Sequence, residues 1–216
     1  MIVKTIPVTN FQTNCYIYNT DKKNCVIIDP GGDENIIIES INQNDFIPKL
    51  ILLTHSHPDH LAALPGLKAK YNVPFAVHNN ESELFKPSAM KQNKDILYAM
   101  GFTQDIVENI CNNIPFPEMV LNDNDMIQEF QLSVIHTPGH TPGSCCFYAK
   151  ENSLLFSGDT LFNFGIGRTD FPGGDTQKIL SSIKEKLFIL PENTEVYPGH
   201  GPKTNIDIEK NHNPFF

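Results

Sequence analysis

The chain has 216 residues, of which 40% are hydrophobic, so it can bury a sizeable core, and we expect a single domain over residues 1–216. The formal net charge of −9 repels phosphate backbones and argues against nucleic acid as a partner. Neither a signal peptide nor a run of membrane-spanning length is recognisable, which predicts a cytoplasmic protein with no membrane partner.

Three β-strands are predicted at the N-terminus, over residues 2–7, 13–18 and 24–29, with short polar turns between them. The third strand ends in a turn, and we expect Asp33 to cap the helix that follows. Four isoleucines between residues 36 and 41 have the spacing of that helix.

The next apolar run, Leu50 to Leu53, has the length of a buried strand and leads directly into the segment Thr-His-Ser-His-Pro-Asp-His, residues 54–60. Pro58 suits the first turn of a helix that we expect to continue to about Tyr71. A polar cluster between a strand and a helix is in the place where α/β folds carry functional groups.

The spacing within this cluster indicates metal binding. His55 and His57 are two residues apart in an extended segment, so both point to one side and can hold one ion. Asp59 and His60 lie beyond the turn and are placed to reach a second ion. A polar loop without metal is the alternative, and we favour it less because three histidines and an aspartate gather directly after a strand.

A short strand is expected over residues 75–77. Residues 80–118 then form a polar segment in which we predict two helices, about 88–100 and 103–112, as an insertion outside the sheet. Such an insertion either covers a site or is a structural excursion.

The second half repeats the pattern of the first. Strands are predicted over 126–130, 132–135, 145–149, 154–156 and 195–197, with a helix over 175–188. Two similar halves predict an α/β protein in which two sheets face each other with helices outside, an αβ/βα four-layer sandwich. The five cysteines form no CxxC pair, and we expect free thiols.

Three later polar residues follow apolar strands and stand beside glycine or proline: His140, Asp159 and His200. Together with the first cluster they provide five histidines and two carboxylates, which suit two zinc ions. Asp159 is suited to bridge the two ions because a carboxylate has two oxygens.

The order HxHxDH, PGHT, GD and PGHG resembles the metallo-β-lactamase superfamily almost from end to end. The resemblance implies that the first metal is held by His55, His57 and His140, the second by Asp59, His60 and His200, and that Asp159 bridges them. Two cations about 3.5–4 Å apart lower the pKa of a shared water, and the resulting hydroxide would attack a carbonyl carbon while Asp59 accepts the proton.

Within the superfamily, the stretch Gly167-Arg168-Thr169-Asp170 and the closing Asn-Pro-Phe-Phe are similar to the short glyoxalase II-like hydrolases. This resemblance implies hydrolysis of S-lactoylglutathione or a related small-molecule thioester by two zinc ions, with iron or mixed occupancy as a variant. The chain does not show the helical domain that supplies glutathione contacts in full-length glyoxalase II, so poor saturation by glutathione conjugates is expected.

Other activities remain open. An iron-dependent persulfide dioxygenase shares the GRTD stretch, and other esterases or lactonases share the ligands. The best-known β-lactamases carry arginine in place of His60 and cysteine in place of Asp159, so little activity on β-lactams is expected. Arg168 either binds a substrate carboxylate or pairs with Asp170 or Asp175, and we favour the salt bridge.

Overall fold

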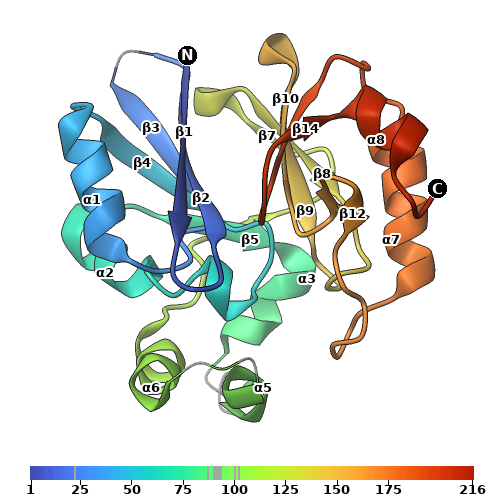
Figure 1. Ribbon diagram of the computed structural model, residues 1–216. Coiled ribbons are helices and arrows are strands. Elements are labelled where there is room, and N and C mark those ends of the chain that lie inside the picture. Colours follow the sequence, from blue (N-terminus) through green and yellow to red (C-terminus); the bar gives the residue numbers. More distant parts are fainter. Residues whose placement is uncertain (22, 87, 90–93, 100, 102) are drawn as a thin grey trace.

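The computed structural model describes residues 1–216 except 22, 87, 90–93, 100 and 102. Two six-stranded sheets form the middle of the molecule, with the strand orders β1-β2-β3-β4-β5-β6 and β14-β13-β10-β9-β8-β7. Helices lie on the outer side of each sheet, α1 and α2 on one side and α7 and α8 on the other (Figure 1). The sequence therefore predicted the αβ/βα sandwich correctly.

The strands of the first sheet are β1 Ile2–Val8, β2 Thr13–Asn19, β3 Asn24–Ile28, β4 Ile47–Leu52, β5 Phe75–His78 and β6 Met119–Leu121. Those of the second are β7 Met126–Ile127, β8 Leu132–His136, β9 Cys145–Ala149, β10 Leu154–Gly158, β13 Glu195–Pro198 and β14 Thr204–Asn205. A separate hairpin joins β11 Leu161–Phe162 to β12 Gly165–Ile166.

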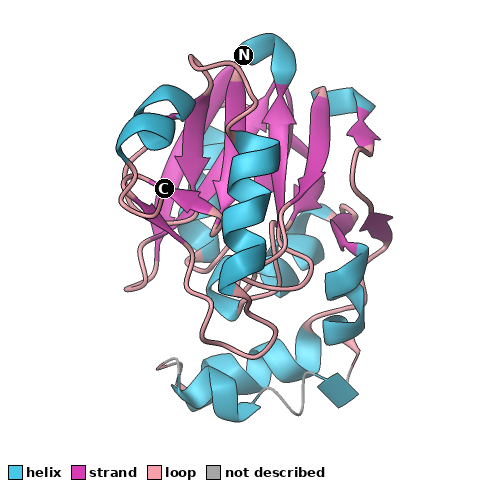
Figure 2. Ribbon diagram, turned by 90° about the vertical axis from the view of Figure 1, so that its right-hand side faces the viewer, coloured by secondary structure: helices cyan, strands magenta, loops and turns pink. Residues whose placement is uncertain are grey.

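The α-helices in the described part of the chain are α1 Glu34–Gln43, α2 Leu64–Tyr71, α3 Asn79–Ser82, α5 Lys94–Ala99, α6 Gln104–Asn113, α7 Thr176–Ser182 and α8 Ile206–His212. A π-helical segment, Ile183–Leu187, extends α7. Figure 2 shows this long helix lying against the strands of the second sheet.

Successive side chains of a strand point to opposite faces of the sheet, so a central strand such as β2 or β9 contributes to one apolar cluster between the sheets and to another under the helices. In β2, Tyr16 and Tyr18 point between the sheets, whereas Cys15 and Ile17 point toward α1 and α2. In β9, Phe147 points between the sheets and Cys146 points toward α7. All of the strand residues of β2 and β9 are buried, because both faces of each sheet are covered.

Three local predictions were wrong. The strand expected over residues 126–130 ends at Ile127, and Gln128–Phe130 form a 3₁₀ turn. The helix expected from Pro58 is divided into a 3₁₀ turn, Pro58–His60, and the separate helix α2, so Asp59 and His60 lie in a turn. Asp33 precedes α1 but makes no side-chain cap; its carboxylate instead accepts a hydrogen bond from the backbone N–H of Thr9 at 2.6 Å.

Residues 80–118 lie between β5 and β6, which are neighbours in the first sheet. The helices α5 and α6 occur in this segment (Figure 1), although part of the predicted 88–100 helix lies outside the described residues. None of the described helices is long and apolar enough to cross a membrane.

Truncation of Phe147 tests the packing between the sheets. This side chain is fully buried in the central cluster, so Phe147→Ala should lower the free energy of unfolding by about 3–5 kcal/mol. Urea unfolding of metal-free protein measures the loss. Ile189→Ala is the control because Ile189 is 74% exposed, and it should change the free energy by less than about 0.5 kcal/mol.

Candidate metal centre

The seven predicted ligands meet between the two sheets. His55, His57 and the Pro58–His60 turn follow β4 of the first sheet. The other three come from the second sheet: His140 from the loop after β8, Asp159 directly after β10, and His200 shortly after β13. The ends of strands from both sheets thus supply one cluster, although the residues are up to 145 positions apart.

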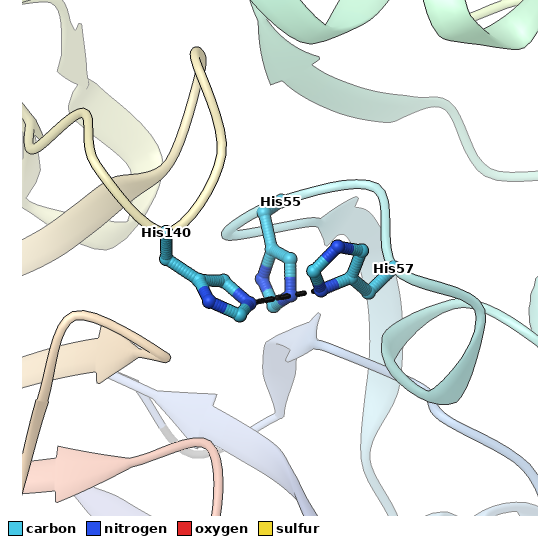
Figure 3. Close-up of side chains that lie close together, drawn as sticks. All are labelled: His55, His57 and His140. Atoms are coloured by element: carbon cyan, nitrogen blue, oxygen red, sulfur yellow. Dashed lines mark hydrogen bonds between the residues drawn. The ribbon is translucent and has the colours of Figure 1, made fainter. Parts of the chain in front are cut away.

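His55, His57 and His140 form the first group, and their rings point toward one another (Figure 3). The Nε2 atom of His140 lies 3.2 Å from Nε2 of His55 and 2.8 Å from Nδ1 of His57. The other ring nitrogen of His140 donates to the carbonyl oxygen of Arg168 at 2.7 Å. This bond leaves a lone pair on Nε2, so the three nitrogens offer converging lone pairs to a cation.

A hydrogen-bonded chain orients His55. Thr54 donates its hydroxyl proton to Asp29 at 2.7 Å, so its oxygen accepts from Nδ1 of His55 at 3.1 Å. Asp29 also accepts from Nδ1 of His60 at 3.0 Å. The Nε2 lone pairs of both histidines are therefore directed away from Asp29 and into the cluster.

Asp59, His60 and His200 form the second group, in which the candidate ligand atoms lie within 4.8 Å of one another. Nδ1 of His200 donates to the carbonyl oxygen of Phe11 at 3.1 Å, which leaves Nε2 facing Asp59 at 3.2 Å. A third group, His55, His60 and Asp159, shares His55 with the first group and His60 with the second.

Asp159 faces both groups. Its Oδ1 lies 3.4 Å from Nε2 of His60, and its Oδ2 lies 3.6 Å from Nε2 of both His140 and His200. Each carboxylate oxygen is thus turned to different histidines, which is the arrangement that a bridging ligand requires.

The charges of the cluster also fit metal ions. Burial alone would lower the pKa of His60, but Asp159, Asp59 and Asp29 surround it and raise its pKa well above the usual value. Three carboxylates around one ring require a nearby positive charge. Among the described residues, His60 Nε2 and Asp159 Oδ1 are buried without hydrogen-bond partners. A cation between them would satisfy both atoms.

His55 and His57 of the first group have the protonation state that metal binding requires. Burial and the neighbouring histidines lower the pKa of His55 well below its usual value. Burial and His140 lower the pKa of His57 to about 3. Both rings are therefore neutral at pH 7, and neutral imidazole is the form that binds metal.

Several residues that support the cluster have no motif of their own. Asn14 donates from its backbone to the carbonyl of Gly199 at 2.7 Å, and its side-chain amide donates to the carbonyl oxygens of Pro198 and Gly201. The first sheet thus holds the loop that carries His200. Gly199 is required because a Cβ there would lie 2.1 Å from Oδ1 of Asp159.

Asp29 and Asn14 were not singled out from the sequence. Asp29 follows an apolar strand, as Asp159 does, and this shared position in the sequence could have marked it as a residue of the site. Asn14 lies inside a strand, where nothing in the sequence marks a supporting side chain. Thr13 is similar: its hydroxyl donates to Asp59 at 3.1 Å.

A cavity of about 560 Å³ opens onto the cluster, within the size range of small-molecule sites. Five of the candidate ligands line it: His57, Asp59, His140, Asp159 and His200. The other described lining residues are Phe11, Phe162, Ile166, Arg168 and Phe171. Described residues of the 80–118 segment do not line it.

Arg168 lies at this cavity and makes the expected salt bridge. Its guanidinium donates to both carboxylate oxygens of Asp170, at 2.8 and 2.7 Å, and stacks on Phe171 with 3.8 Å to the ring centre. Asp175 instead caps α7 by accepting from the backbone N–H of Lys178. A substrate-binding role for Arg168 stays a prediction.

Comparison with known proteins gives the family. The sequence model of the metallo-β-lactamase superfamily matches residues 8–200, most of the chain. The chain belongs to the metallo-β-lactamase superfamily. The match places the chain among the metal-dependent hydrolases of this superfamily, and the paired ligand groups described above form a potential dinuclear metal centre.

The relatives in the superfamily have diverse names. The hydroxyacylglutathione hydrolase GloC of Haemophilus influenzae is 38% identical, with 100% of this chain and 98% of GloC covered. The crystal structure of BLEG-1, described as a B3 metallo-β-lactamase, is 37% identical with a TM-score of 0.86 and 99% of each chain covered. TTHA1623, solved in a di-iron-bound form, is 33% identical with a TM-score of 0.84, covering 99% of this chain and 100% of its own.

Metal content tests the proposed ligands. Purified protein should contain close to two ions per chain, and Asp159→Ala should lose metal because the group that faces both sites is removed. Elemental analysis measures the stoichiometry. Lys203→Ala should retain both ions, since Lys203 is exposed and pairs with Glu195 at 2.8 Å. Full metal content in the Asp159 variant would contradict the bridging role.

Proposed function

We propose that this protein hydrolyses a small-molecule thioester in the manner of glyoxalase II, with two divalent ions, zinc in the first instance. The observation that carries the proposal is that members of both ligand groups line one cavity together with three phenylalanines. The name of GloC supports the thioester class, since that relative is covered over nearly its whole length.

A pair of divalent ions, when bound, would supply an activated water and a Lewis acid for the carbonyl oxygen. The chain contributes the positioning. Phe162, Ile166 and Phe171 offer apolar surface that can hold an acyl or thiol group and exclude bulk water. Asp59 is the predicted proton acceptor, with Oδ2 held by the hydroxyl of Thr13.

The cavity offers little for a charged thiol carrier. Among its described lining residues, Arg168 is the only lysine or arginine, and its guanidinium is engaged by Asp170. Glutathione carries two carboxylates, so both would compete with Asp170 for the same cation. Poor saturation by glutathione conjugates is therefore part of the proposal.

A substrate panel tests the proposal directly. Zinc-loaded protein should turn over S-lactoylglutathione and an uncharged acyl thioester, with a higher KM for the glutathione conjugate. Initial rates on thioesters, lactones, a phosphodiester and a β-lactam provide the comparison. Little β-lactam turnover is expected because neither arginine at position 60 nor cysteine at position 159 is present.

Chelator-treated protein and Lys203→Ala are the controls, the first inactive and the second fully active. Rapid cleavage of the phosphodiester without thioester cleavage would refute the proposed substrate class. A reproducible single iron per chain, together with oxygen uptake on a persulfide substrate, would favour the dioxygenase instead. Because TTHA1623 was solved in a di-iron-bound form, the elemental analysis should measure iron as well as zinc.

A further inference from the structure

Glu81 is a fully buried carboxylate that belongs to neither ligand group. It lies in the short helix α3, directly after β5, and is 0% exposed. Among the described residues no lysine, arginine or histidine forms an ion pair with it. A buried carboxylate without a cation is costly unless its oxygens accept several hydrogen bonds.

The hydrogen bonds of Glu81 go to two different loops. Its Oε2 accepts from the backbone N–H of Ser56, at 3.0 Å, and from the Ser56 hydroxyl. Its Oε1 accepts from the hydroxyl of Thr141 at 2.6 Å and from the backbone N–H of Gly143 at 2.8 Å. One carboxylate therefore connects a loop of the first sheet with a loop of the second.

Both loops carry ligands of the first group. Ser56 stands between His55 and His57, and Thr141 immediately follows His140. The contact is close, because a Cβ on Gly143 would lie 2.5 Å from Cγ of Glu81. The position of Glu81 thus determines how far the two halves of this ligand group stand apart.

We propose that Glu81 is a positioning residue that sets the spacing of His55 and His57 relative to His140, and thereby the affinity of this group for its metal. The inference rests on the metal centre of the proposed function but not on its substrate. The second group, Asp59, His60 and His200, has its own supports and does not contact Glu81 through the bonds described above.

The substitution Glu81→Gln removes a necessary acceptor while preserving the size of the side chain. Each carboxylate oxygen binds one backbone N–H, which cannot reverse its direction as a hydroxyl can. Whichever way the glutamine amide is turned, its NH₂ group faces one of these two N–H groups. One of the loops is therefore released.

Metal titration in competition with a chromophoric chelator measures the effect without substrate. Glu81→Gln should lower the affinity for one of the two ions on the order of 10–100-fold and leave the affinity for the other nearly unchanged. Ser56→Ala removes one hydroxyl donor and should lower the affinity for the same ion by a smaller factor. Glu83→Gln is the matched control, because Glu83 is close in sequence, 70% exposed in its side chain, and paired with Lys86.

Combining Glu81→Gln with a second substitution that removes a ligand of one group shows which ion is affected. In protein that carries His200→Ala, only the first group is intact, and Glu81→Gln should lower its metal affinity. In protein that carries His140→Ala, only the second group is intact, and Glu81→Gln should not change its affinity. Wild-type affinity in Glu81→Gln, or equal weakening of both ions, would overturn the proposal. Should Glu81→Gln fail to fold, Ser56→Ala is judged by the same criteria. Failure of thioester hydrolysis would leave these affinities unaffected, so the two proposals fail separately.

Discussion

The rest of the structure depends on one constraint: several carboxylates and histidines are buried together where strands of the two sheets end. Asp29, Asp59 and Asp159 surround His60 at the end of a hydrophobic core, where unpaired carboxylates are costly. The cluster is stable only if positive charge lies among them. Metal bound there would add positive charge to the folded state, so the apoprotein should be less stable than the loaded protein.

A framework of hydrogen bonds from residues outside the two ligand groups holds the cluster in place. Thr54 connects Asp29 to His55, Asn14 holds the loop of His200, and Glu81 connects the two loops of the first group. Apart from the bond between the neighbours Thr54 and His55, each of these contacts joins segments that are far apart in the chain. Because interior packing resists continuous adjustment, such contacts can determine ligand spacing to within fractions of an ångström.

The cavity walls, rather than the metal ligands, are the part of the site that can select a substrate in this protein. Similar chains are described as a hydroxyacylglutathione hydrolase, as a B3 metallo-β-lactamase and as a protein solved in a di-iron-bound form. A dinuclear centre can activate water for several electrophiles, so selectivity must come from what the walls accept. Here the walls are largely aromatic, and the guanidinium of Arg168 is already paired with Asp170.

The sequence by itself determined the sandwich and the candidate ligands, since strand periodicity and a polar residue after each apolar strand are local patterns. His55, His140, Asp159 and His200 were found in this way. Tertiary structure alone decided their partners: Glu81 sits in a polar segment without a motif, and its bonds reach 25 and 62 positions along the chain. Long-range hydrogen bonds depend on which sheets pack together, and no local pattern records that.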